Sequence, residues 1–411
     1  MIEQLFPTAA ARKRLFIGPL APHVEGLAVY VVSLGYVRLS VKQKLRLVAG
    51  LSTWLHRRQL PITALNEELV SQFMDYRRRR RFGHGSRATG KLLLSYLRSC
   101  DIIPPPTEVI DNSPLMRLVR EYEQFLASER GLSPATLTNY LPTIRRFLTE
   151  RFGGEALVLD DLCPQDTHRF ILRHADRGSR GRAQLMVTAL RSFLRFLYQR
   201  GDITSDLAGA LPSVANWRLS HLPKSLLPEQ VERLLASCDR QTAIGRRDFA
   251  ILLLLARLGL RAGEVVALTL EDLDWEAGAF TVHGKGNRRE QLPLPEDVGD
   301  ALVDYLRHGR PPCTSRRVFI RGYAPHQGFA SSVAVCDVVR RALARTGLNP
   351  PFKGAHLLRH SLATRMLRGG ASLAEIGDIL RHCRPETTQI YAKVDLDALH
   401  ALAPPWAGGA L

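Results

Sequence analysis

Cysteine is scarce in this chain, and its spacing matches no familiar metal or disulfide pattern. The 411 residues include six cysteines, namely Cys100, Cys163, Cys238, Cys313, Cys336 and Cys383. They form no C-x-x-C pair and have no histidine at metal-ligand spacing, which argues against a zinc finger and against a disulfide framework. We therefore expect reduced thiols and a cytoplasmic protein.

Long apolar runs and cofactor-binding motifs are also missing. The longest apolar stretch, Ile251 to Leu260, is interrupted by Arg257 and is too short to cross a bilayer, so it predicts a buried helix. The N-terminal residues have no continuous apolar core before a small-residue cleavage site, so we expect no secretory signal. No G-x-x-x-x-G-K-S/T loop and no metal cluster is recognisable, so we expect neither a cofactor nor a metal.

Acidic residues are outnumbered by basic ones. The chain has 57 Lys and Arg against 39 Asp and Glu, a net charge of +18. Such a surplus attracts nucleic acid or an anionic membrane surface, and a basic, ribosome-associated protein is the plainest alternative. With 45% hydrophobic residues the chain can build buried cores, and its length predicts two or three domains.

Proline-rich breaks near residues 104–106 and 212–223 divide the chain into three parts. The first two parts share landmarks at an offset of 93 residues: Ser40 and Ser133, Trp54 and Phe147, Gly85 and Gly178. Each serine precedes a helical apolar pattern and is a candidate N-cap, and each part predicts a bundle of about four helices. Duplication explains the shared spacing, although short helical patterns can also match by chance.

Arginines gather near the predicted helix ends of both bundles. Charge runs are usually solvated surfaces, but arginines beside helix N-termini also suit phosphate contacts, and we expect them to face DNA. They are Arg77 to Arg81 and Arg87, with Lys91, in the first part, and Arg145, Arg146, Arg151, Arg177, Arg180 and Arg182 in the second.

The third part, which begins near Ser225, predicts helices around a small sheet. The apolar period changes to two over Ala279–Val282 and over Gln291–Leu294, and a glycine-rich turn at 283–287 joins these strands. The expected helices before the sheet are an amphipathic one from Leu227, a buried one over Arg246–Leu260 and a third over Glu264–Leu270. The predicted fold class is mostly α with one small antiparallel sheet.

Residues in this third part supply what phosphodiester exchange through a tyrosine requires. The nonbridging oxygens need positive charge, and the departing oxygen needs a proton. A phenol costs roughly 4 kcal/mol to ionise at pH 7, and nearby cations or a base offset that cost. Arginine suits the phosphate because its planar fork donates two hydrogen bonds and stays charged. The candidates are Arg261, Lys285, His356, Arg359, His382 and Tyr391.

Each candidate also has an ordinary structural explanation. Arg261 can cap a helix, Lys285 is a typical hairpin-tip lysine, and Tyr391 alone is more often a packing residue. His356 and His360 have the i, i+4 spacing of a metal pair, but no acid stands where H-E-x-x-H requires one. No single residue identifies an enzyme.

Four motifs in a fixed order carry more weight than any single residue. They are LGLRAGEVVALTLEDLDW (258–275), HGKGNRREQLPLP (283–295), HLLRHSLATRML (356–367) and ILRHCRPETTQIYAKV (379–394). With them, residues 226–395 closely resemble the catalytic domain of the tyrosine recombinases, also called the phage integrase family. Residues 110–205, with ERGLSPATLTNYLPTIRRFL, resemble the family's helical, SAM-like core-binding domain, which binds DNA.

The resemblance implies a role for each residue at a matching position. Arg261 and Arg359 would hold the scissile phosphate, and Lys285 would protonate the leaving 5′ oxygen. His356 would assist proton transfer at the tyrosine.

The last motif completes the implied site. His382 would hydrogen-bond a nonbridging oxygen in the transition state, and Tyr391 would attack to leave a 3′-phosphotyrosyl link. Glu264 would support the site. One position departs from the family, which usually has glycine before this histidine, whereas this chain has Arg381. A glycine there suits helix packing or a helix end, so we expect Arg381 to perturb that geometry or to add a phosphate contact.

By this resemblance, the chain is a site-specific DNA recombinase, an integrase or transposase of a mobile element. It would hold double-stranded DNA in a clamp and exchange strands through a Holliday junction, as a homo- or hetero-tetramer with or without accessory proteins. A type IB topoisomerase, a catalytically inactive DNA-binding accessory protein and a metal-dependent nuclease are the alternatives. Residues 21–105 exceed the family's two-domain plan and would be a duplicated core-binding domain or an arm-site or partner-binding module. The tail, 396–411, is expected to pack against a neighbouring protomer.

Overall fold

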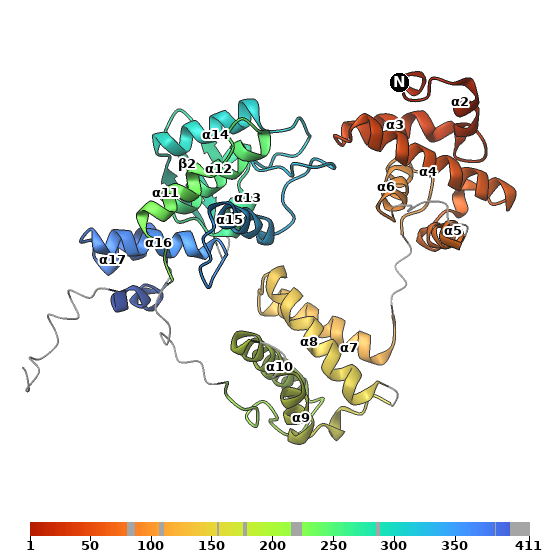
Figure 1. Ribbon diagram of the computed structural model, residues 1–411. Coiled ribbons are helices and arrows are strands. Elements are labelled where there is room, and N and C mark those ends of the chain that lie inside the picture. Colours follow the sequence, from red (N-terminus) through yellow and green to blue (C-terminus); the bar gives the residue numbers. More distant parts are fainter. Residues whose placement is uncertain are drawn as a thin grey trace, which may run out of the picture. The chain divides into compact units, whose positions relative to one another are not determined.

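In the part of the chain that the structure describes, helices predominate and one small sheet is present (Figure 1). The side chains of this part form three large buried cores. The computed structural model describes residues 1–79, 87–106, 111–153, 156–175, 179–214, 224–284, 288–382 and 384–394. The predicted fold class, mostly α with a small antiparallel sheet, is confirmed. Among the described helices, none is both long and apolar enough to cross a membrane.

The first core belongs to the N-terminal helices. Trp54 and Phe73 pack in it, with ring centroids 5.8 Å apart. Residues 1–106 contain 17 Lys and Arg but only 6 Asp and Glu, so +11 of the chain's +18 lies here. The helices are α1 (Ile2–Leu5), α2 (Ala9–Leu15), α3 (Val24–Ser33), α4 (Arg38–Arg57), α5 (Glu67–Arg79) and α6 (Arg87–Ser99), with 3-10 turns at Ala21–His23 and Ile62–Ala64.

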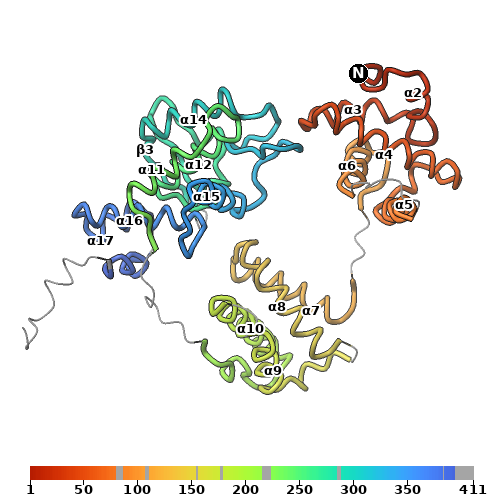
Figure 2. The backbone as a smooth tube through the Cα atoms, viewed as in Figure 1, coloured from red at the N-terminus to blue at the C-terminus, as the bar shows by residue number. Residues whose placement is uncertain are grey.

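The second core belongs to four helices that can be followed as a tube in Figure 2. Tyr122, Phe193 and Phe196 form its aromatic centre. The elements are α7 (Pro114–Gln124), which continues as a π-helical turn (Phe125–Glu129), α8 (Pro134–Phe152), a 3-10 turn (Leu159–Asp161), α9 (Pro164–Ala175) and α10 (Arg180–Arg200). Helix α8 packs against α7 and α10, and α9 packs against α10.

The two serines predicted as matching N-caps behave differently. Ser133 is the N-cap residue of α8, because Pro134 lacks an N–H and fixes the first helical position. Ser40 is inside α4, whose N-cap residue is Val37, so that prediction is wrong. Good helix formers directly before Ser40 extend the helix backwards. Each bundle has a long second helix, α4 of 20 residues and α8 of 19, and duplication stays a prediction.

The third core surrounds α12, which packs against α11, α14, α15 and α16. The sheet is antiparallel in the order β1-β2-β3, and Val282 faces Glu290 across β2 and β3. Both predicted strands are present, whereas β1 is only two residues long and carries no periodic signal. The elements are α11 (Pro228–Ala236), α12 (Ala243–Arg257), α13 (Ala262–Ala267), a 3-10 turn (Leu270–Asp272), β1 (Leu273–Asp274), β2 (Ala279–His283), β3 (Arg289–Pro293), α14 (Glu296–His308), α15 (Ser332–Thr346), α16 (His356–Arg368), α17 (Leu373–Ile379) and two 3-10 turns (Pro385–Thr387, Gln389–Val394).

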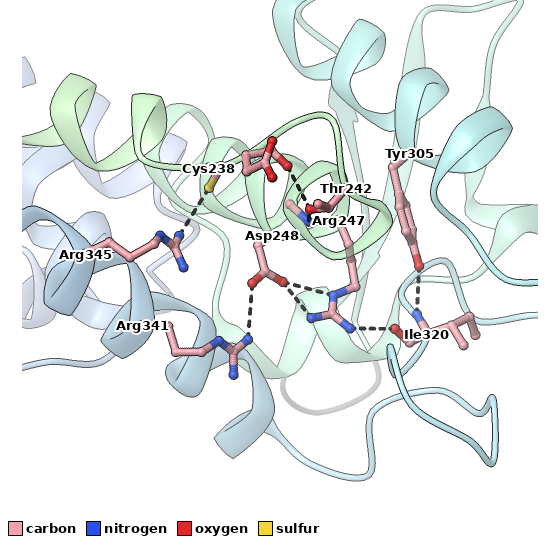
Figure 3. A network of polar contacts seen from close by, with 10 residues as sticks. Cys238, Thr242, Arg247, Asp248, Tyr305, Ile320, Arg341 and Arg345 are labelled. Atoms are coloured by element: carbon pink, nitrogen blue, oxygen red, sulfur yellow. Dashed lines mark hydrogen bonds and ion pairs between the residues drawn. The ribbon is translucent and has the colours of Figure 1, made fainter. Parts of the chain in front are cut away.

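A polar network holds α12 in this core (Figure 3). The buried carboxylate of Asp248 accepts hydrogen bonds from Nη2 of Arg247 (2.7 Å) and Nη2 of Arg341 (3.2 Å). Nη1 of Arg247 donates to the carbonyl of Ile320 (3.0 Å), whose own N–H donates to the hydroxyl of Tyr305 (3.1 Å). The network ties α12 to α14 and α15. Helix α16, which carries the candidates His356 and Arg359, packs against α12.

Candidate active site

Arg359 is the most deeply buried cation of the site. It lies in the first turn of α16, is 3% exposed, and donates through Nη1 and Nη2 to the carbonyls of Gly259 and Leu380. Gly259 has φ of +59°, and a Cβ there would lie 2.7 Å from the Leu380 side chain, so a larger residue would be strained. Burial, followed by the charges of Arg261 and Arg381, lowers the pKa of Arg359 to about 10, which leaves it charged at neutral pH.

Arg261 is the N-cap residue of α13 and is held by a buried acid. Its backbone N–H donates to Oε2 of Glu264 (2.8 Å), and its Nη1 donates to Oε1 of the same carboxylate (2.7 Å). Nη2 donates to the carbonyl of Arg381 (3.0 Å). Burial alone would raise the pKa of Glu264, but hydrogen bonds from Arg261 and the charge of Arg381 hold it below its usual value. Glu264 therefore stays an anion that orients Arg261.

Tyr391 lies with its ring in a small apolar cluster between α16 and α17. It is 1% exposed and packs among residues that include Leu362 and Leu380. Its hydroxyl lies 2.8 Å from Nδ1 of His360. Burial raises the pKa of Tyr391 to about 12, although the charge of Arg359 opposes this. The phenol is therefore protonated, and it donates to His360 in the tautomer that leaves Nδ1 without a proton.

The histidines around this phenol are neutral at pH 7. Burial, then His356 and Arg359, lowers the pKa of His360 to about 4, and burial with the neighbouring arginines lowers the pKa of His382 to about 4. Loss of water contact, followed by the charges of Arg359 and Arg261, also lowers the pKa of His356. Neutral imidazoles can accept a proton, which charged ones cannot.

His382 has a hydrogen-bond partner that orients its ring. Its Nδ1 lies 2.7 Å from the hydroxyl of Thr388, which is buried. When that hydroxyl donates to Nδ1, the neutral ring carries its proton on Nε2 and can donate it to an oxygen in the cavity.

One cavity of about 580 Å³ collects most of the candidates. Lys224 and Phe352 also line it, with the ammonium 4.7 Å from the ring centre. Of the six principal candidates, the cavity is lined by Arg261, His356, Arg359, His382 and Tyr391. The sixth, Lys285, lies outside the described residues, as does the tail 396–411.

His360 is the site residue that sequence reasoning missed. It also lines the cavity and lies one helical turn after His356, with ring centroids 6.2 Å apart. The i, i+4 spacing was the available signal, but its interpretation was restricted to metal binding. Among the described residues, no group of three or more His, Cys, Asp or Glu is arranged to hold a metal.

Arg381 keeps the backbone geometry that a glycine would supply. Its φ is +54°, in the left-handed region, directly after α17. Its side chain is 7% exposed and is directed to two acids: Nη2 lies 3.0 Å from Oε2 of Glu264, and Nε lies 3.6 Å from Oε2 of Glu290. The Arg381 side chain thus contacts two acids, and the expectation that it perturbs this geometry or adds a phosphate contact stays a prediction.

Comparison with known proteins agrees with this arrangement. Residues 224–397 match the Phage integrase family, and residues 119–201 match the Phage integrase N-terminal SAM-like domain. A putative integrase/recombinase, y4rA, of Sinorhizobium fredii (strain NBRC 101917 / NGR234) is 46% identical over 394 residues, which cover 96% of each chain. The tyrosine recombinase XerD of Proteus mirabilis is 33% identical over 291 residues, covering 68% of this chain and 90% of XerD.

A solved structure shares the fold. The XerH site-specific recombinase in a post-cleavage complex with its palindromic difH substrate superposes with a TM-score of 0.55 at 18% identity, covering 76% of this chain and 93% of that one. The sequence matches, together with the arginines, histidines and tyrosine around one cavity, show that this chain belongs to the phage integrase family of tyrosine recombinases and is a DNA strand-transferring enzyme.

Proposed function

We propose that this chain cuts and rejoins double-stranded DNA at a specific site through a covalent bond to Tyr391. The observation that carries the proposal is the single cavity lined by two arginines, three histidines and the tyrosine. The arginines would bind the nonbridging oxygens of one phosphate, and the tyrosine oxygen would attack phosphorus. The bond energy kept in the phosphotyrosyl link would allow rejoining without ATP.

The proton of the phenol has a nearby acceptor. As the bond from the Tyr391 oxygen to phosphorus forms and the bond to the 5′ oxygen breaks, the phenolic proton passes to Nδ1 of His360, 2.8 Å away. Burial raises the pKa of Tyr391 and lowers the pKa of His360, so a separate transfer is strongly uphill and we infer that transfer accompanies bond formation. We therefore assign this step to His360, and not to His356 as the resemblance implied.

The remaining roles follow from the donors left free. Arg359 uses two of its five N–H donors on backbone carbonyls, which leaves donors for phosphate. His382 would donate to a nonbridging oxygen through Nε2. The 5′ oxygen leaves as a hydroxyl and needs one proton, and Lys285 is assigned this step on the resemblance alone.

Partners are proposed on the same basis. The net charge of +11 in residues 1–106 suits DNA, and we assign this part a role in DNA binding, outside the two matched domains. The name of the Sinorhizobium relative favours integration or recombination. A mobile element, a tetramer and a Holliday junction are proposed on the family resemblance alone.

Trapping of the covalent intermediate tests the proposal. Duplexes from the DNA that flanks the gene are nicked so that the released strand diffuses away, and the protein–DNA adduct is counted after denaturation. Tyr391→Phe should abolish the adduct; an adduct that persists would remove Tyr391 as nucleophile. Recombinants between two such sites exclude a topoisomerase that only relaxes DNA, and adduct formation in EDTA excludes a metal-dependent nuclease.

A further inference from the structure

We propose that Arg381 is a positioning residue that fixes the guanidinium of Arg261 for phosphate binding. The proposal rests on the function proposed above, and it concerns a residue that the family pattern does not contain.

The backbone at this position is left-handed. A φ of +54° places a Cβ in a crowded conformation that glycine tolerates and arginine does not favour. Such a residue persists where its surroundings over-determine it. The contacts of the Arg381 side chain are what can hold it in this conformation.

Those contacts close a ring around Arg261. The carbonyl of Arg381 accepts from Nη2 of Arg261 (3.0 Å), and Nη2 of Arg381 donates to Oε2 of Glu264 (3.0 Å). The other oxygen of Glu264 accepts from Nη1 of Arg261 (2.7 Å). Arg381 thus holds Arg261 twice, directly through its carbonyl and indirectly through the carboxylate.

The ring is also tied to the sheet. Nε of Arg381 lies 3.6 Å from Oε2 of Glu290, and Nη1 donates to the carbonyl of Ile379 (3.3 Å). Glu290 belongs to β3 and faces Val282 of β2. A glycine at position 381 would allow the same φ but would make none of these side-chain contacts. The carbonyl of residue 381, which accepts the hydrogen bond from Arg261, would then be held by the main chain alone.

Arg381 acts through Arg261 and does not replace it. Its guanidinium is 7% exposed, and each of its three nitrogens is directed to an oxygen of the protein. A loosened Arg261 would still carry its charge, but its donors would be misaligned with the nonbridging oxygens. Such misalignment of the donors of Arg261 lowers the rate of the chemical step by about 10- to 100-fold.

The test compares Arg381→Gly, Arg381→Lys and Arg261→Ala in the full chain. Glycine is compatible with the positive φ, so that variant keeps the fold, and Gln59→Gly is the matched control for relief of a positive φ (55°) far along the sequence. Single-turnover adduct formation is measured on a nicked duplex that the unaltered chain cleaves. A second duplex carries a methylphosphonate at the scissile position, which removes the negative charge that Arg261 binds.

We expect Arg381→Gly to slow adduct formation by about 10- to 100-fold on the ordinary duplex, with Arg381→Lys in between and Gln59→Gly unchanged. On the methylphosphonate the deficits of Arg381→Gly and Arg261→Ala should shrink together, because both concern the same charge. A rate for Arg381→Gly equal to that of the unaltered chain overturns the proposal, and so does a deficit of the same size on both duplexes. Failure of the unaltered chain to form any adduct would instead refute the proposed function.

Discussion

Replacement of His360 by glutamine separates the two histidines of α16. Glutamine can still accept a hydrogen bond from Tyr391, whose hydroxyl lies 2.8 Å from Nδ1 of His360, but it cannot take the proton. The change therefore removes a base while it keeps a polar partner for a buried phenol. His356→Gln, one turn earlier on the same helix, is the matched control.

The size of the effect follows from the role assigned. A positioned general base contributes about 10²- to 10⁴-fold to a proton-transfer step, so His360→Gln should slow cleavage by that factor. DNA affinity should stay within about twofold, because a neutral histidine buried beside the tyrosine adds no charge for phosphate. The control should retain more activity than His360→Gln.

Rapid quenching of adduct formation measures the chemical step, and fluorescence anisotropy with labelled duplex measures binding. The rate of the unaltered chain should fall at acid pH as His360 becomes protonated, starting from a pKa of about 4 in the DNA-free protein. The glutamine variant should lack this acid limb. If His360→Gln cleaves at a normal rate and His356→Gln does not, the acceptor is His356 and the present assignment is wrong.

Three further predictions concern burial, protonation and charge. Arg359→Met should lower the free energy of unfolding in urea by about 2–5 kcal/mol, because two buried carbonyls lose their donors; an unchanged midpoint would contradict this. The pKa of His360 lies near 4 in the folded chain and near 6.5 in the unfolded chain. Its contribution to the free energy of unfolding is therefore fully present above pH 6.5 and falls by up to about 3 kcal/mol towards pH 4. His360→Gln should flatten that part of the melting-temperature curve, and an equally steep curve would refute the cause. Arg87→Ala combined with Lys91→Ala, two exposed positions, should reduce the slope of log affinity against log salt by up to about 2. An unchanged slope would contradict a role of these side chains in DNA binding.

Motif order was enough to predict which residues gather around the cavity. Arg261, His356, Arg359, His382 and Tyr391 all line it, and their catalytic roles stay predictions. Apolar periodicity predicted the main helices and the two longer strands, β2 and β3. These features depend on local sequence, which is why they could be read from it.

Features that depend on tertiary neighbours could not be predicted. The pairing of Tyr391 with His360, and not with His356, is set by where the last 3-10 turn meets α16. The left-handed φ of Arg381 was foreshadowed by the family's glycine, but its two acidic partners come from α13 and β3. Ser40 was misjudged because an N-cap depends on where the preceding residues leave the helix, and no proline fixes that point in α4.

The left-handed arginine also has a consequence for how this lineage can change. A non-glycine residue in that conformation costs about 1–2 kcal/mol, which its contacts with acids offset. Glu264 is needed for Arg261 in any case, whereas the ion pair of Glu290 among the described residues is with Arg381 and requires a cation at position 381. Residues 290 and 381 should therefore vary together among relatives. Where position 381 is arginine, position 290 should be an acid, and where position 381 is glycine, position 290 should tolerate many residue types. A chain that changes only one of the two would carry either an unpaired acid or a poorly compensated backbone.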